Sequence, residues 1–239
     1  MRRIILLIAA FLPLSFALSQ EITDTHINKV DAQGRRQGLW RVYDGEGNLK
    51  FTGNFVNDKP VGEFKYFYPN GKQKAVVMQL DSGKIAYTTN YHPNGNMMAR
   101  GKYVNQKKDS TWLYYGEADG TLASEETYSA GKKIGTFKVY YSDGKVAEEI
   151  NYKDDIKDGP WVQYFTDGTV KLKATYKAGN LEGMYVYYYM NGKVQVSGTY
   201  LNGVRDGTWV YLTDIGEMEK REEYRNGRMI DQELFEIKK

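Results

Sequence analysis

Residues 183–207 read GMYVYYYMNGKVQVSGTYLNGVRDG, and this stretch decides the fold. Two runs rich in Val and Tyr flank Asn191-Gly192. That dipeptide is a strong β-hairpin signal, and we expect both of its residues to take positive φ. After it, apolar and polar residues alternate, which is typical of a strand with one buried face. We expect a looser turn at Asn202-Gly203. The stretch therefore predicts one hairpin and a connection to the next.

The same pattern recurs along the chain, mostly at intervals of 24 residues. One ring column consists of Trp40, Phe64, Trp112, Phe137, Trp161, Tyr185 and Trp209, and a later one consists of Phe55, Tyr103, Tyr128, Tyr152, Tyr176, Tyr200 and Tyr224. A third column starts at Tyr43, and a glycine column marks the hairpin turns. A fixed period is the mark of a repeat architecture. We therefore predict eight repeat units over residues 38–231.

The repeats predict an all-β fold. About sixteen short strands would form an elongated antiparallel β-meander in one twisted sheet, roughly 77 Å long at the usual strand spacing. We interpret residues 20–37 as an N-terminal cap and residues 232–239 as a tail over the other edge. The three ring columns should be core positions, because rings on neighbouring strands stabilise a sheet by roughly 0.2–1 kcal/mol per pair.

One unit departs from the pattern. It carries Thr88 in place of the ring and Ala86 in place of the opening glycine, and Gln79 precedes it in place of the later aromatic residue. We interpret this stretch as a kink, a weak seam or a place where another molecule docks.

The first 19 residues differ from the rest. Arg2 and Arg3 precede the apolar run IILLIAAFLPLSFAL, and small residues follow. This is typical of a secretory signal peptide, with cleavage expected near Ser19 and Gln20. The mature protein would then be periplasmic or secreted. The alternative is an uncleaved membrane anchor, which the short run and Pro13 disfavour.

Composition argues against several classes of function. The formal net charge is +3, and it falls to +1 without Arg2 and Arg3, so no nucleic-acid partner is expected. The chain has no Cys and only His26 and His92, which leaves little for nucleophilic catalysis or a metal site. We therefore expect no enzyme activity, no cofactor and no metal.

A patchier ring column supplies the candidate binding residues. Its members follow directly after a ring of the Tyr43 column, and they are Tyr68, His92, Tyr141, Phe165 and Tyr189. Rings in an exposed row can stack on sugars, grip a peptide or complete an oligomer interface. Alternatively, they lie beneath the twist of neighbouring strands and bind nothing.

The repeat resembles a known family. The pattern GxWxxYYxNGxxxxxGxYxNGxxxG, seen in residues 135–159 and 183–207, is similar to the variant MORN repeat of bacterial proteins grouped as the YwqK-like antitoxin family. The resemblance covers nearly all of the mature chain. It implies strings of β-hairpins that scaffold contacts with proteins or lipids, and no enzyme activity. The antitoxin grouping implies a protein that blocks a partner toxin.

These observations favour an exported, non-enzymatic repeat scaffold that binds a macromolecular partner. We expect this partner to be a protein. Binding of carbohydrate or cell wall through exposed rings is one alternative, and neutralisation of a toxin is another. Association with a lipid surface is weaker, because the charge is near neutral. The residues do not indicate an oligomeric state.

Overall fold

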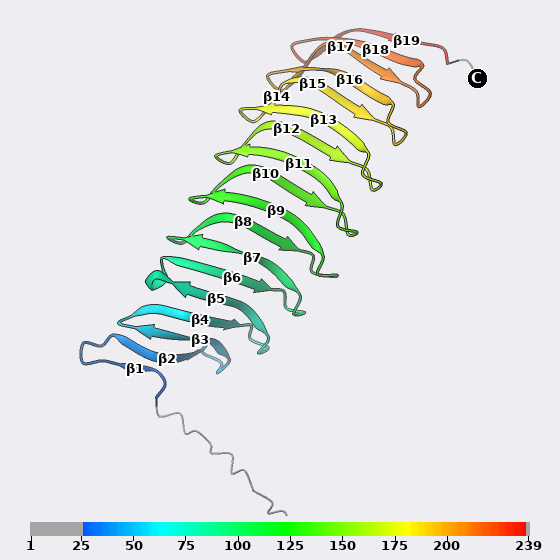
Figure 1. Cartoon of the computed structure of the whole chain (residues 1–239). Coiled ribbons are helices and arrows are strands. Elements are labelled where there is room, and N and C mark those ends of the chain that lie inside the picture. The colour runs from blue at the N-terminus through cyan, green and yellow to red at the C-terminus, as the bar shows by residue number, and fades with distance from the viewer. Residues whose placement is uncertain (1–25, 238–239) are drawn as a thin grey trace, which may run out of the picture.

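The computed structural model of the chain describes residues 26–237, which form one antiparallel sheet of 19 strands. Each strand pairs with the strands before and after it in the chain, except that β14 and β15 both pair with β13. Figure 1 shows the strands in chain order, with β1 and β19 at opposite ends. The predicted elongated all-β meander is confirmed.

The elements are short and evenly spaced. They are β1 (Lys29–Val30), β2 (Arg36–Tyr43), β3 (Leu49–Val56), β4 (Lys59–Phe67), β5 (Gln73–Leu80), the 3₁₀ turn η1 (Asp81–Gly83), β6 (Ile85–Tyr91), β7 (Met97–Val104), β8 (Lys107–Tyr115), β9 (Leu122–Ser129), β10 (Lys132–Tyr140), β11 (Val146–Lys153), β12 (Ile156–Tyr164), β13 (Val170–Lys177), β14 (Asn180–Leu181), β15 (Gly183–Tyr188), β16 (Val194–Leu201), β17 (Val204–Leu212), β18 (Met218–Arg225) and β19 (Arg228–Leu234).

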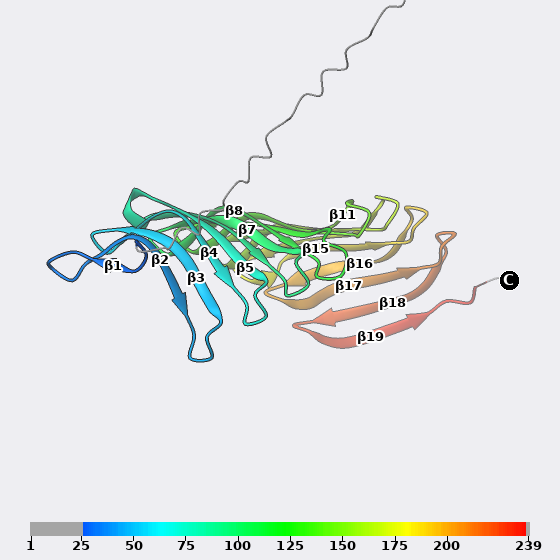
Figure 2. The same cartoon turned by 90° about the horizontal axis from the view of Figure 1, so that it is seen from below.

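Three strands add to the sixteen that the repeats predict. β1 comes from the capping segment and pairs with β2, and the short β14 is separate from β15. β19 spans the predicted boundary at residue 231 and is itself the last edge strand, with all seven of its residues exposed. The signal peptide predicted at 1–19 lies outside the described residues. Figure 2 shows β2–β5 and β17–β19 running at different slopes, so the sheet twists along its length.

The two long edges of the sheet carry different turns. At Asn191-Gly192 the loop has three residues, Tyr189 and Lys193 close it, and only Gly192 has positive φ (81°). The Asn191 side chain instead accepts a hydrogen bond from the Lys193 N–H (3.0 Å). The expectation of two positive φ values here is wrong, because a three-residue hairpin loop uses one left-handed residue after a type I turn.

The opposite edge carries the two-residue turns. Leu201 pairs with Val204, and both residues between them, Asn202 (φ 51°) and Gly203 (φ 84°), are left-handed. This is the type I′ geometry, which matches the twist of the strands. The turn expected to be looser is therefore the tighter of the two.

A bulge near the start of the first strand bends most repeats. At Gly62, with φ 71°, the register between β3 and β4 shifts. The equivalent position is a left-handed glycine in most units, but Ser110 holds φ 59° there. The left-handed conformation costs a non-glycine residue about 1–2 kcal/mol.

We expect Ser110→Gly to raise the free energy of unfolding by about 0.5–1 kcal/mol. The relief of backbone strain outweighs the extra entropy that glycine loses on folding, which is about 0.5–1 kcal/mol. Urea unfolding followed by circular dichroism measures this. The reciprocal change Gly135→Ser, at a glycine with φ 66°, should destabilise by a similar amount. A destabilised Ser110→Gly protein would contradict the argument.

One face of the sheet, called the ring face here, carries Trp40, Phe55, Phe64 and their equivalents. Apart from glycines, the residues that are at least about nine-tenths buried are Phe55, Phe64, Ala75, Ala86, Thr88, Ala99, Trp112, Ile150, Leu172, Ala174, Trp209 and Glu222. Rings of neighbouring strands touch, as in Phe55–Phe64 (centroids 5.2 Å apart) and Tyr103–Trp112 (4.8 Å). We call this series of rings the ring ladder.

The Tyr43 column lies on the other face. Tyr43, in the first unit, is 53% exposed, so the assignment of this residue to the core is wrong, whereas the later members of the column are half-buried. Residues three apart on a strand point to opposite sides, and Trp40 already occupies the ring face.

Glycines beneath the rings set their depth. A Cβ built on Gly53 would lie 2.2 Å from the ring of Phe64, and the same holds for Gly101 with Trp112. The absence of a side chain there lets each ring lie flat on the neighbouring strand, which explains exposures of only 2% for Phe64 and Trp112.

Candidate functional site

The five predicted binding residues lie at the three-residue turns, where each is half-buried. Three tyrosine hydroxyls donate to a carbonyl of the next repeat: Tyr68 to Tyr91 (2.8 Å), Tyr141 to Tyr164 (2.6 Å) and Tyr189 to Leu212 (2.9 Å).

The other two members of this column make different contacts. The Nε2 atom of His92 lies 3.3 Å from the Tyr115 carbonyl, and Lys171 Nζ lies 5.8 Å from the ring of Phe165. Most of the column thus joins successive repeats. Contact of these residues with a partner stays a prediction.

Two carboxylates occupy positions where other units have glycine beneath a ring. Glu222 is 6% exposed, and it accepts hydrogen bonds from Lys220 (2.8 Å), Tyr211 (2.7 Å) and Tyr224 (3.1 Å), with Arg205 at 3.5 Å. Burial raises the pKa of Glu222, but the hydrogen bonds outweigh it and hold the pKa below its usual value.

Glu126 forms a similar cluster. It accepts hydrogen bonds from Lys133 (2.8 Å) and Tyr128. Neither cluster was foreseen from the sequence. Glu222 is buried and Glu126 is partly buried, and each carboxylate is paired with its own cation and hydroxyl donors on the ring face. We therefore assign both clusters a structural role.

The lowered pKa of Glu222 makes stability depend on pH. Its contribution is complete above the unfolded-state pKa, about 4.5, and is lost as the pH falls through the lower folded-state value. We expect the melting temperature of Glu222→Gln to fall less steeply than that of the wild type between about pH 6 and pH 3. Glu46→Gln, at an exposed turn, is the matched control and should keep the wild-type slope. Parallel profiles for wild type and Glu222→Gln would refute the assignment.

The ring ladder is interrupted once within the described residues. Gln79 and Thr88 occupy two successive ring positions, between Phe64 on one side and Tyr103 on the other. Thr88 pairs with Val77, where the neighbouring units have glycine. We call this place the ring gap.

The backbone differs at the ring gap as well. β5 and β6 pair in continuous register without the bulge, because Ala86 replaces the opening glycine. The connecting turn is η1, in which Asp81, Ser82 and Gly83 are all left-handed. Gly83 packs against Pro60, whose Cγ would lie 2.9 Å from a Cβ at this position.

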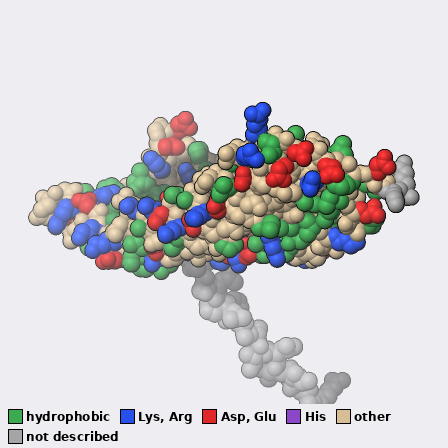
Figure 3. Space-filling view, turned by 90° about the horizontal axis from the view of Figure 1, so that it is seen from above, with side chains coloured by type: hydrophobic (Ala, Val, Ile, Leu, Met, Phe, Trp, Pro, Cys, Tyr) green, Lys and Arg blue, Asp and Glu red, His purple; other side chains and the backbone are tan. Residues whose placement is uncertain are grey.

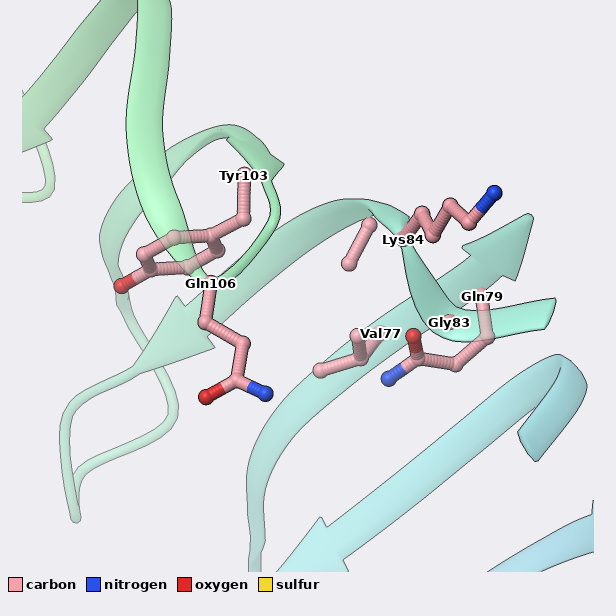
Figure 4. Close-up of a pocket in the computed structure, with 7 residues that line it drawn as sticks. Val77, Gln79, Gly83, Lys84, Tyr103 and Gln106 are labelled. Carbon is pink, nitrogen blue, oxygen red and sulfur yellow. The ribbon is translucent and has the colours of Figure 1, made fainter. Parts of the chain in front are cut away.

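A hollow of about 350 Å³ lies at the ring gap, lined by Val77, Gln79, Gly83, Lys84, Ala86, Tyr103 and Gln106. Figure 4 shows the Tyr103 ring and the side chains of Gln79 and Gln106 around one space, while Lys84 extends away from it. The hollow therefore combines an aromatic wall with two amides.

A second hollow of about 330 Å³ continues the first along the ring face and shares Val77, Gln79 and Tyr103 with it. It adds the rings of Tyr66 and Phe67 and the side chains of Lys50, Lys74, Ala75, Thr88 and Asn90. No Asp or Glu lines either hollow, so the combined groove is aromatic and positively charged. The sequence marked Gln79 and Thr88 as exceptions, but it did not reveal this groove.

Over residues 26–237, no group of three or more His, Cys, Asp or Glu side chains could hold a metal ion. No helix in the same range is long and apolar enough to cross a membrane.

Comparison with solved structures gives only remote similarity. A crystal structure of an S. aureus TarM mutant in complex with Fondaparinux, alpha-GlcNAc-glycerol and UDP is 11% identical, with a TM-score of 0.19 over 70% of this chain and 22% of that one. The Photorhabdus luminescens Tc holotoxin pore is 14% identical, with a TM-score of 0.21 over 82% of this chain and 13% of that one. TM-scores this low support no conclusion about fold or function. No curated protein matches the chain.

The family comparison agrees with the repeats. The model described as MORN repeat variant matches residues 36–57, 60–74, 133–154, 157–178 and 181–202. The second match stops within β5, and residues 75–132, which hold both the unit with Thr88 and the regular unit with Trp112, are not matched. Residues 203–237 are not matched either. The matches give no support to the antitoxin grouping in particular. The chain is a repeat protein built from variant MORN repeats.

Proposed function

We propose that this protein is an exported, non-enzymatic scaffold that binds a partner protein on its ring face. The observation that carries the proposal is the single-layered sheet, because no other element of the described residues covers the ring face. Rings such as Tyr185 and Tyr200 are only half-buried there. A row of half-buried rings can pack against the aromatic and apolar side chains of a partner.

The surface charges fit a protein partner. In the view of Figure 3, basic and acidic side chains are interspersed, with no large patch of one sign. Mixed charge around aromatic residues is usual at protein interfaces, whereas a polyanion requires a dominant positive field. Export is proposed from the apolar segment at 1–19.

Carbohydrate binding is the second candidate. The groove at the ring gap places the rings of Tyr66 and Tyr103 beside the amides of Gln79 and Asn90. Rings and amides also suit a sugar, which offers both flat apolar faces and hydroxyl groups. Neutralisation of a toxin would be one form of protein binding, and identification of the partner would decide it.

Site-specific photo-cross-linking in the native cell envelope tests the scaffold proposal. A photoreactive phenylalanine analogue replaces Tyr187 on the ring face or, as a matched control, the exposed Thr175 on the other face. We expect one recurrent partner from position 187 and none from position 175, and the purified partner should bind the purified chain. No recurrent partner, or equal capture from both faces, would refute the proposal.

A further inference from the structure

We propose that the ring gap receives an aromatic side chain of the partner protein, flanked in the partner's sequence by carboxylates. This inference rests on the proposed function and names the chemistry of the segment that the scaffold recognises. Three features of the groove support it: the interrupted ring ladder, the amides around the hollow and the charge beside it.

The interrupted ladder argues for a ring. Phe55–Phe64 and Tyr103–Trp112 are ring pairs in contact on either side of the gap. Between them the chain supplies no ring of its own, and Thr88 is too short to fill the place that Phe64 and Trp112 fill in their units. An incoming ring would pack against Tyr103 and restore the edge-to-face contacts that neighbouring units make.

The size of the hollow fits such a guest. An apolar cavity of about 150 Å³ is enough to bind benzene, and small-molecule sites begin near 300 Å³. The hollow of about 350 Å³ is therefore large enough for a phenol or an indole ring. Val77 and Ala86 provide its apolar lining.

The amides argue for a polar edge on the guest. In the described part of the chain, the side chains of Gln79 and Gln106 make no hydrogen bond, although both line the hollow. They are free to pair with an indole N–H, a phenol O–H or a peptide group of a bound segment.

Charge complementarity argues for neighbouring carboxylates. Lys50 and Lys74 line the adjoining hollow, and neither hollow contains an acidic side chain. Lys74 Nζ lies 5.7 Å from the ring of Tyr68, and Lys84 at the rim forms an ion pair with the exposed Asp81 at 3.7 Å. A segment with Glu or Asp beside its aromatic residue would place negative charge near these lysines.

The probe is the peptide Glu-Glu-Trp-Glu-Glu, titrated to millimolar concentration into the full ¹⁵N-labelled chain. We expect shifts of the amide signals of Gln79, Tyr103 and Gln106. Two matched peptides, one with Ala for Trp and one with Gln for every Glu, should bind at least about tenfold more weakly. A loss of this size is usual when a central anchor residue is removed from an interface. No shift at these amides, or equal binding of either matched peptide, would overturn the proposal.

Three variants of the protein test whether the peptide binds at the ring gap. Gln79→Tyr puts a ring where neighbouring units have one and should weaken binding by about tenfold or more, with the circular dichroism spectrum unchanged. Lys74→Glu should do the same by reversing a charge. Lys171→Glu is its matched control, because Lys171 holds the equivalent place beside Phe165, and it should leave binding intact. Equal loss in both lysine variants would overturn the proposal.

The sugar alternative is tested in the same titration. Shifts at Gln79 and Tyr103 with chitohexaose, and none with the peptide, would overturn the inference in favour of carbohydrate. Failure of the inference differs from failure of the scaffold proposal. If position 187 still cross-links a partner while the peptide does not bind, the ring face binds protein without using the ring gap.

Discussion

The Trp209→Ala protein is expected to lose about 3–5 kcal/mol of free energy of unfolding, the range for truncating a buried large aromatic residue. Trp209 is 0% exposed, and its ring contacts those of Tyr200 (5.1 Å), Tyr185 (5.6 Å) and Tyr224 (6.4 Å). Its indole N–H also donates to the Thr199 carbonyl (3.2 Å). The change leaves a void in a sheet only one layer thick.

Urea unfolding followed by circular dichroism measures the loss, and hydrogen exchange locates it. Because repeat proteins are stabilised by nearest neighbours, the loss of protection should centre on β15–β18. Tyr43→Ala is the control, since Tyr43 is 53% exposed and should cost less than about 1 kcal/mol. A Trp209→Ala protein as stable as the Tyr43→Ala protein would contradict the ring ladder as the core.

Gly198→Ala is expected to destabilise by about 1–3 kcal/mol, although it adds only one methyl group. A Cβ at residue 198 would lie 2.2 Å from Cδ2 of the Trp209 indole, which is 0% exposed and packed against Tyr200. The backbone of Gly198 is not left-handed, so the cost is steric and not conformational. Thermal or urea unfolding of the purified variant measures it.

Gly45→Ala separates this clash from the general effect of replacing glycine. A Cβ there would meet nothing within 4 Å, and the backbone is not left-handed, so a change of less than about 1 kcal/mol is expected. In the double variant Gly198→Ala/Trp209→Ala the clash disappears, so its destabilisation should fall short of the sum of the single changes. Strict additivity would show that the ring does not lie over Gly198.

The positions of the turns were predictable, but their types were not. Asn191-Gly192 and Asn202-Gly203 are the same dipeptide, yet one lies in a three-residue loop and the other in a two-residue loop. The difference depends on which flanking residues pair, Tyr189 with Lys193 or Leu201 with Val204. That register is set by neighbouring strands and cannot be read from the dipeptide.

The face of the Tyr43 column could have been predicted from the same sequence. An odd spacing from Trp40 places the two side chains on opposite faces of a strand. Glu222 could also have been noticed, because it aligns with Gly53 and Gly198 beneath the rings. Its burial as a satisfied carboxylate could not, since the donors Lys220, Tyr211 and Tyr224 come together only in the folded sheet.

The sequence predicted the irregular unit but not the hollow that forms the candidate site. Gln79 and Thr88 break two columns, and that signal correctly marked an irregular unit. The hollow itself depends on the continuous pairing of β5 with β6 and on the directions of the Gln79, Gln106 and Tyr103 side chains. Neither the strand pairing nor the side-chain directions can be read from the aligned repeats.

The off-centre place of the interrupted unit has a mechanical consequence. A molecule bound between β5 and β7 would lie near one end of the sheet. The strands from β9 to β19 would then extend roughly 50 Å beyond it at the usual strand spacing. The remaining repeats would then act as a spacer arm, and each unit gained or lost in evolution would change its reach by roughly 10 Å.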